Sequence, residues 1–234
     1  CGAPEKITGC KIIPLHTNNG KITVDLIKPH VKGFGFEHHS QPKVISITQA
    51  TELGTVYTPE EIKKITSFAH KNNMLVHVDG ARICNAAASL GLSLKNITTD
   101  VNIDILSFGG TKNGMMYGEA VIFFNKNMAD NFKYIRKQST QLTSKMRYIS
   151  AQFEALLSNN IWLKNAEHSN KMAKLLADKI KNIHRITITQ KVETNGIFAI
   201  IPQEYISIIQ EKYFFYVWDE DKSEVRWMTS YDTT

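Results

Sequence analysis

The chain has 234 residues, enough for one large domain or two of moderate size. Apolar residues make up 42% and charged residues 21%, a balance that excludes disordered and collagen-like chains. No apolar run is long enough to predict a membrane-spanning helix. Lys and Arg outnumber Asp and Glu by 28 to 22, but the excess is scattered lysine without an Arg-rich helix or a basic aromatic patch. The charge pattern therefore argues against nucleic-acid binding.

The cysteines Cys1, Cys10 and Cys84 are odd in number and show no CxxC spacing. This pattern argues against a zinc site or a disulfide framework, and it favours a reducing compartment, so we predict a cytoplasmic protein. The sequence starts at a cysteine within a Gly-Ala-Pro loop and stops at Thr234, just after a strand-like run. We therefore expect a chain that is truncated at both ends.

The first part of the chain alternates between strand and helix signals. A short apolar run predicts a strand over 11–15, and Thr23 is typical of the cap of a helix that would reach about Gly33. The β-branched run 44–48 predicts a buried strand. The segment 58–61, Thr-Pro-Glu-Glu, contains a complete capping box and predicts the start of a helix with Ile62, Ile65 and Ala69 on its buried face.

The alternation continues with a strand over 74–78 and an Ala-rich helix over 81–90 that Gly91 would end. Further strands are predicted over 103–108 and 120–124. A parallel crossover needs a dozen residues or more, so the short loop between these two strands also fits an antiparallel pair. Strands that alternate with helices predict an α/β fold with a mostly parallel sheet.

After residue 125 the pattern changes to long helical stretches over 127–158 and 160–181. Shorter elements follow, with strands predicted over 186–189, 197–201, 214–217 and 225–228 and a helix over 203–211. We therefore predict two domains, a large α/β domain over 1–125 and a small C-terminal α+β domain over 126–234 that includes the connecting helices.

Charged residues follow two of the predicted strands at their carboxyl ends, where ligands bind in open α/β sheets. Asp79 and Arg82 follow the strand over 74–78, and Lys112 lies on a glycine-bracketed loop after the strand over 103–108. Simpler interpretations are a helix N-cap for Asp79, a surface position for Arg82 and a solvated loop for Lys112.

Two considerations weigh against these simpler interpretations. A cation in a first helical turn opposes the helix dipole, so we expect Arg82 to have a specific anionic partner. The glycines let the backbone approach a ligand and let Lys112 project into a cleft. Together the acid, the arginine and the lysine suit pyridoxal phosphate, which needs a lysine for its Schiff base and an aspartate for its pyridinium nitrogen.

Two segments, 77–82 (HVDGAR) and 107–114 (SFGGTKNG), resemble the threonine aldolases in the β-eliminating lyase group of pyridoxal-phosphate fold type I enzymes. The segments 51–57, 144–147 and 225–228 fit the same family, and the resemblance covers nearly the whole chain. It implies a fold type I large domain, incomplete here, with a small C-terminal domain. It also implies a homodimer or homotetramer, and a lyase that cleaves L-threonine or L-allo-threonine to glycine and acetaldehyde.

The resemblance also implies roles for individual residues. Lys112 would form the Schiff base, and Thr111 would contact the phosphate or the ring. Asp79 would pair with the pyridine nitrogen, and Arg82 would bind on the phenolate side of the cofactor or near the substrate carboxylate. Arg226 matches the carboxylate-binding arginine, for which a bidentate fork is well suited, although an edge-strand surface position also fits it.

The remaining roles are a threonine near the cofactor and the base that takes the hydroxyl proton. Thr51 matches the threonine, and a strand-end turn also explains it. His39 is our candidate for the base, because the family has a histidine three residues before a proline and His39 precedes Pro42 in this way. A solvated loop position fits His39 equally well, whereas His77 lies inside a predicted strand and suits the core.

One departure from the family concerns the phosphate. The phosphate-binding turn and the ring-stacking histidine of the family lie upstream of the first residue, and the segment 33–38 lacks the third glycine of a dinucleotide loop. We therefore expect the chain as given to bind the cofactor poorly or not at all. Alternatives are another fold type I enzyme, an aminotransferase or a β-eliminating lyase, and an inactive fragment or pseudoenzyme that acts through its surface. No metal, membrane or nucleic-acid partner is predicted.

Overall fold

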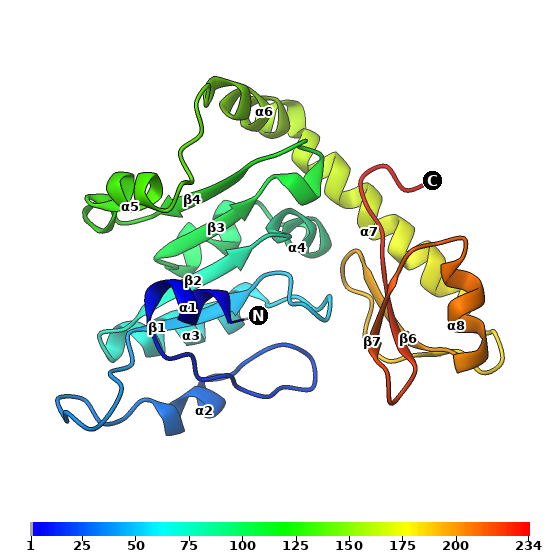
Figure 1. The fold of residues 1–234 in the computed structure, drawn as a ribbon, viewed down its shortest axis with the longest axis horizontal. Helices are drawn as coiled ribbons and strands as arrows, with labels where there is room; N and C mark the ends of the chain where they lie inside the picture. The colour runs from blue at the N-terminus through cyan, green and yellow to red at the C-terminus, as the bar shows by residue number, and fades with distance from the viewer. Residues whose placement is uncertain (1) are drawn as a thin grey trace.

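The computed structural model describes residues 2–234, in which two β-sheets are joined by a long helix (Figure 1). The first sheet consists of β1 (Val44–Thr48), β2 (Leu75–Gly80), β3 (Ile105–Gly109) and β4 (Glu119–Phe123), in that order. Strands β1 to β3 are parallel, and β4 pairs with β3 in the antiparallel direction. The predicted α/β fold with a mostly parallel sheet is confirmed, and the short loop before β4 does give an antiparallel pair.

Eight α-helices occur in residues 2–234. They are α1 (Ala3–Thr8), α2 (Val24–Ile27), α3 (Pro59–Lys71), α4 (Ile83–Leu90), α5 (Phe132–Gln138), α6 (Arg147–Leu157), α7 (Ile161–Ile180) and α8 (Gln203–Gln210). Single 3-10 turns lie between them: η1 (Lys28–His30), η2 (Lys95–Ile97), η3 (Thr99–Val101), η4 (Thr111–Asn113), η5 (Lys126–Ala129) and η6 (Ser158–Asn160).

Helix α3 begins where its capping residues predict. The Thr58 hydroxyl accepts a hydrogen bond from the backbone N–H of Glu61 at 3.3 Å, and the Glu61 carboxylate accepts one from the N–H of Thr58 at 2.7 Å. Both ends of the capping box are thus satisfied. The buried face of the helix contains Ile62, Ile65 and Ala69, as the spacing predicts, and it packs against the first sheet.

Strand β2 separates the core from the face that carries polar groups. Val76 and Val78 are fully buried, on the side where α3 and α4 contact the strand. His77 and Asp79 are only half-buried and lie on the opposite side, because side chains alternate along a strand. The helices therefore build the core on one side of the sheet and leave the other side for polar side chains.

Three predicted elements differ in the structure. Residues 11–15 form no strand, and the helix capped by Thr23 ends after one turn, where Pro29 enters the 3-10 turn η1. The helical stretch predicted over 127–158 is broken between α5 and α6, where Thr140 and Lys145 have positive φ angles of 60° and 61°. Residues in this conformation cannot continue a right-handed helix.

The second sheet is antiparallel, and its strand order is β5 (Thr187–Ile188), β6 (Gly196–Ile200), β8 (Glu224–Met228) and β7 (Tyr216–Asp219). Helix α7 packs against β6 and also against α4 of the first unit. The division of the chain at residue 125 into two domains stays a prediction. No helix within residues 2–234 combines the length and the apolar character needed to cross a bilayer.

A buried polar network joins α4 to α7. The Asn85 side chain donates to the hydroxyl of Ser169 at 2.8 Å and to the amide oxygen of Asn170 at 3.0 Å. The Asn170 side chain donates in return to the backbone carbonyl of Asn85 at 2.9 Å. All three residues are buried, so each hydrogen bond replaces one that water would otherwise supply.

We expect Asn85→Ala to lower the free energy of unfolding by about 2 kcal/mol, because it leaves buried polar groups on α7 without partners. Chemical denaturation of the purified variant measures the change. Asn131→Ala is the matched control, because Asn131 is exposed and its side chain makes no capping hydrogen bond. A variant of Asn85 that is as stable as the control would contradict a structural role for this network.

Candidate active site

The parallel register brings the carboxyl ends of three strands to one edge of the first sheet. Thr48 of β1 pairs with Asp79 of β2, and Asp79 pairs with Ser107 of β3. The backbone N–H of Gln49 donates to the carbonyl of Asp79 at 2.8 Å. The residues that follow each strand therefore lie along this edge, where open α/β sheets bind ligands.

The turn after β2 and the end of β3 lie in direct contact. A Cβ atom placed on Gly109 would lie 2.6 Å from the Cα of Ala81, closer than real Cβ atoms approach other atoms. Only glycine permits this approach. The contact brings the Asp79–Arg82 turn beside the loop that carries Lys112, so the two segments that resemble the threonine aldolases are adjacent in space.

Asp79 closes the turn that follows β2. Its Oδ1 accepts a hydrogen bond from the backbone N–H of Ala81 at 3.0 Å. The N-cap position of α4 is Arg82, and it has no side-chain cap. The interpretation of Asp79 as the helix N-cap is therefore wrong, and its half-buried carboxylate remains available on the polar side of the sheet.

Lys112 lies in the 3-10 turn η4, directly after the end of β3. A hydrogen-bonded loop presents it: the Thr111 hydroxyl accepts from the backbone N–H of Gly118 at 3.0 Å and donates to its carbonyl at 3.3 Å. Lys112 is exposed, and within residues 2–234 its amine forms no ion pair. The hydroxyl of Thr111 is thus engaged in shaping the loop, and its predicted contact with a cofactor stays a prediction.

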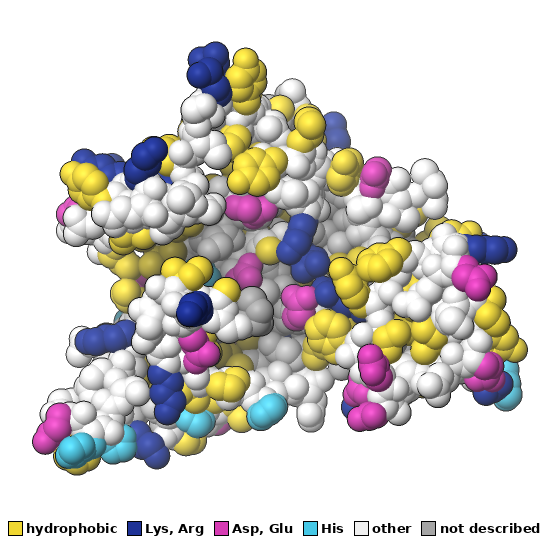
Figure 2. Space-filling model, viewed as in Figure 1, with side chains coloured by type: hydrophobic (Ala, Val, Ile, Leu, Met, Phe, Trp, Pro, Cys, Tyr) yellow, Lys and Arg dark blue, Asp and Glu magenta, His cyan; other side chains and the backbone are white. Residues whose placement is uncertain are grey.

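A narrow cleft, which the surrounding side chains nearly fill, lies between this edge and the second sheet. Its lining residues are Thr51, Glu52, Gly54, Arg82, Thr194, Asn195, Gly196, Arg226 and Met228. Figure 2 shows basic and acidic side chains side by side in the hollow between the two parts of the molecule. The residues that line the cleft thus come from the segments at the ends of β1 and β2 and from the region of strands β6 and β8.

One carboxylate faces two arginines in this cleft. Glu52 Oε1 lies 2.8 Å from Arg226 Nη1, and Glu52 Oε2 lies 3.9 Å from Arg82 Nη1. The arginine side chains are only 11% and 14% exposed, respectively, whereas Glu52 is 53% exposed. The anionic partner that the sequence predicts for Arg82 is confirmed.

The charges around the cleft act on one another. Burial lowers the pKa of Arg82, and the nearby guanidinium of Arg226 lowers it further, whereas the carboxylates of Glu52 and Asp79 oppose this shift. Two buried cations at close range favour the binding of an anion. The cleft therefore suits a ligand with a carboxylate, and Asp79 belongs to the same group of interacting charges.

Arg226 is held on an interior strand. Strand β8 lies between β6 and β7, so the interpretation of Arg226 as an edge-strand surface residue is wrong. Its guanidinium lies 5.8 Å from the ring centre of Phe198 and 5.3 Å from that of Trp218. Its Nε atom is buried and has no hydrogen-bond partner within residues 2–234. A buried donor without a partner is costly, which points to a ligand acceptor at this position.

Thr51 lines the cleft, but its polar groups are engaged in a turn. Its hydroxyl lies 2.7 Å from that of Thr55 and accepts from the Thr55 N–H at 3.2 Å. Gly54 completes the turn with a φ of 78°, and its N–H donates to the carbonyl of Thr51. The strand-end turn thus accounts for Thr51, and its role near a cofactor stays a prediction.

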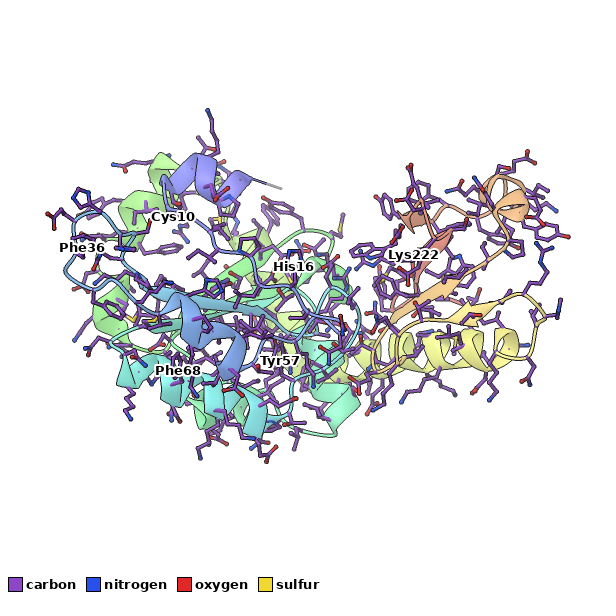
Figure 3. All side chains as sticks on the ribbon, turned by 90° about the horizontal axis from the view of Figure 1, so that it is seen from below. Cys10, His16, Phe36, Tyr57, Phe68 and Lys222 are labelled. Atoms are coloured by element: carbon purple, nitrogen blue, oxygen red, sulfur yellow. The ribbon has the colours of Figure 1, made fainter. Side chains whose placement is uncertain are left out.

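The structure does not bring His39 to the cleft. The loop around it folds on itself, since the Gln41 side chain donates to the carbonyls of Gly33, Phe36 and His39. The rings of His39 and Phe36 are 5.2 Å apart, and Phe36 lies at the end of the first unit that is remote from the second sheet (Figure 3). The assignment of His39 as the base has no support in this geometry and stays a prediction.

His77 lies between two hydroxyls on the polar side of the sheet. Its Nδ1 is 2.9 Å from the hydroxyl of Ser46, and its Nε2 is 3.0 Å from that of Ser107. Burial lowers the pKa of His77, and the negative charge of Asp79 partly opposes the shift. A neutral imidazole tied to both neighbouring strands steadies the sheet next to Asp79, which agrees with a largely structural role.

Sequence reasoning missed the role of Glu52, which lines the cleft, and that of Trp218, which lies beside Arg226. Glu52 comes shortly after the end of β1, so the rule that directs attention to the carboxyl ends of strands applies to it as well. Trp218 gives no comparable signal, because its place beside Arg226 depends on the pairing of β7 with β8.

Comparisons with known proteins agree with this arrangement. The family model of the beta-eliminating lyases matches residues 1–204. The low-specificity L-threonine aldolase of Pseudomonas aeruginosa is 38% identical over 234 residues, which are 100% of this chain and 68% of that protein. The chain belongs to the threonine aldolases of the beta-eliminating lyase family. A low-specificity L-threonine aldolase of Escherichia coli is 26% identical over 196 residues, which cover 82% of this chain and 56% of that enzyme.

A solved structure supports the fold assignment. The threonine aldolase of Leishmania major superposes with a TM-score of 0.90 at 28% identity, over 98% of this chain and 68% of that one. The prediction of a pyridoxal-phosphate fold type I large domain is thereby confirmed, and the second, smaller sheet is antiparallel.

The residues of the site fit the cofactor that this family uses. A half-buried carboxylate at Asp79 lies near the end of β2, and an exposed amine at Lys112 follows the adjacent strand β3; these are the two groups that pyridoxal phosphate requires. The buried Nε of Arg226 has no partner within residues 2–234 and is a further cationic donor. The chemistry of this donor set fits pyridoxal phosphate together with a carboxylate.

The environment of His77 leads to a pH prediction. Because its pKa is lowered below the ordinary value of 6.5, the unfolded chain binds a proton more readily than the folded chain. The contribution to stability is complete above about pH 6.5 and is lost as the pH falls through the lowered pKa. We expect the free energy of unfolding of His77→Gln, measured by urea denaturation, to fall less between pH 7 and pH 5 than that of the wild type.

His30→Gln is the control, because His30 is exposed, and its free energy of unfolding should fall with pH as steeply as that of the wild type. The prediction would be contradicted if the two variants showed the same dependence on pH.

Proposed function

We propose that the intact enzyme to which this chain belongs carries out the pyridoxal-phosphate-dependent cleavage of L-threonine or L-allo-threonine to glycine and acetaldehyde. Residues 1–234 supply the groups described above, whereas the phosphate-binding turn of the family has no counterpart among them. The observation that carries the proposal is the contact between Gly109 and Ala81, which places the Asp79–Arg82 turn beside the Lys112 loop. The related proteins of Pseudomonas and Leishmania major are threonine aldolases by name, which supports the same reaction.

Each residue at this edge has a distinct task in the proposal. Lys112 would supply the primary amine that holds the cofactor. Asp79 would supply the carboxylate that keeps the pyridine nitrogen protonated. Arg226 and Arg82 bind the α-carboxylate of the substrate, because a guanidinium fork matches a carboxylate in geometry and in charge. Thr51 and Thr111 support the turns from which these groups project.

When bound, pyridoxal phosphate supplies a sink for the electron pair that is released at Cα. The cleavage needs three changes in the substrate: the hydroxyl proton leaves to a base, the Cα–Cβ bond breaks to give acetaldehyde, and Cα takes up a proton to give glycine. The two arginines fix the carboxylate and thereby the direction of the Cα–Cβ bond. Orienting the bond that breaks lowers the entropic part of the barrier.

The proposal also covers the compartment, the oligomeric state and the partners of the enzyme. We propose a cytoplasmic homodimer or homotetramer that acts on a free amino acid, without nucleic-acid or membrane partners. Cys10 and Cys84 are free thiols, in agreement with a reducing compartment. Burial raises the pKa of Cys84 to about 12, so this thiol is protonated and unreactive at neutral pH.

We expect the intact enzyme, supplied with pyridoxal phosphate and L-threonine, to release glycine and acetaldehyde in equal amounts. Lys112→Ala should lower turnover by about a thousandfold or more and abolish the absorbance band of the covalently held cofactor, because no other amine is placed at this loop. Exposed Lys126 provides the control, since Lys126→Ala should retain both properties. A 2-oxo acid as the main product, or an unchanged band in the Lys112 variant, would overturn the proposal.

Arg226→Lys should raise KM for L-threonine by between about ten- and a hundredfold, because lysine keeps the charge but loses the bidentate fork. Steady-state kinetics at fixed cofactor concentration measure the effect. The control is Arg185→Lys, since Arg185 forms an exposed pair with Glu204 at 2.9 Å on the second unit. If both variants keep the wild-type KM, Arg226 does not bind the substrate carboxylate.

A further inference from the structure

Glu52 occupies the position at which two arginines present their guanidinium groups. It forms ion pairs with both Arg226, at 2.8 Å, and Arg82, at 3.9 Å. The space between these side chains is too narrow to admit even a water-sized molecule. A second carboxylate can therefore reach the arginines only if Glu52 moves away.

The three side chains are not equally free to move. The guanidinium of Arg226 is enclosed by the rings of Phe198 and Trp218, and Arg82 lies at the start of α4 with little exposed surface. Glu52 is the exposed member of the group, in the short segment between Thr51 and the Gly54 turn. Rotation of its side chain toward solvent keeps the carboxylate hydrated, whereas the arginines have no such alternative.

We propose that Glu52 is an internal stand-in for the substrate carboxylate: it neutralises Arg226 and Arg82 in the empty site and is displaced when the α-carboxylate of an amino acid binds. The proposal rests on the proposed function, because it assigns the carboxylate subsite to the same two arginines. One carboxylate leaves as another enters, so the net charge of the cleft stays constant. Glu52 thereby lowers the affinity for every carboxylate by the strength of its own ion pairs.

The proposal predicts that removing the charge of Glu52 strengthens the binding of a carboxylate at the two arginines. We expect Glu52→Gln to bind acetate about tenfold more tightly than the wild type, which corresponds to about 1.4 kcal/mol. Acetate is the probe because it carries the carboxylate alone and needs neither the cofactor nor turnover. Calorimetric titration of the cofactor-free enzyme measures its affinity, and tryptophan fluorescence follows the same titration because Trp218 lies beside Arg226.

The control is Glu204→Gln, which removes a glutamate from an exposed Arg–Glu pair outside the cleft and should leave acetate affinity unchanged. Glu52→Asp is a milder variant for the case in which Glu52→Gln does not fold. Its carboxylate is one methylene shorter and bridges the arginines less well, so acetate should bind about threefold more tightly. A gain in affinity cannot result from general damage to the site, so it distinguishes displacement from a structural role of Glu52.

Arg226→Gln separates this inference from the proposed function. Loss of acetate binding in Arg226→Gln would support the arginine subsite. If, in addition, the wild type and both Glu52 variants bind acetate equally well, the displacement of Glu52 is overturned. Weaker binding in the Glu52 variants would also overturn it, because Glu52 would then support the bound carboxylate. If acetate binds to Arg226→Gln as it does to the wild type, the carboxylate subsite itself is wrong and both proposals fail.

Discussion

The contact between Gly109 and the backbone of Ala81 is the constraint on which the site depends. Parallel strands in register bring their carboxyl ends to one edge, but the turns that follow them usually diverge because side chains need room. Here the absence of a side chain at Gly109 lets the end of β3 lie against the turn after β2. This contact brings the segment with the carboxylate of Asp79 beside the loop with the amine of Lys112, which is the arrangement that the proposed cofactor role requires.

The cleft concentrates like charges, and this is costly unless the charges are compensated. Two nearly buried guanidinium groups repel each other and have lost most of their hydration, so the folded chain requires a carboxylate near them. Glu52 supplies this carboxylate, and its side chain remains half exposed to solvent. In the proposed function the same two cations that Glu52 neutralises also bind the substrate carboxylate, so stability and binding would compete for them.

Much of the first unit could be predicted from the sequence because its determinants are local. The capping box at Thr58 and the alternation along β2 depend on neighbouring residues; the strand extends to Gly80, so Asp79 lies within it near its carboxyl end rather than after it. Contacts between distant segments could not be predicted in this way. The partnership of Glu52 with Arg226 requires the second sheet to pack against the end of β1, and no local pattern encodes that packing. The break between α5 and α6 was missed for a related reason, since Thr140 and Lys145 take positive φ angles without the glycine that usually signals them.

The residues of the candidate site are divided between two sheets, and helix α7 helps to position one sheet relative to the other. The first sheet and its following loop carry Asp79 and Lys112, to which we assign the cofactor, whereas β8 of the second sheet carries Arg226. The position of the arginine relative to the amine depends in part on how α7 lies on α4, where Asn85 forms its hydrogen bonds with Ser169 and Asn170. A direct hydrogen bond from Thr194 to the carbonyl of Gly54 also joins the two sheets. Packed interiors transmit small displacements because they contain few voids to absorb them. If Arg226 binds the substrate carboxylate as proposed, a substitution in the buried network of Asn85, Ser169 and Asn170 should change that binding through geometry, because none of its residues lines the cleft.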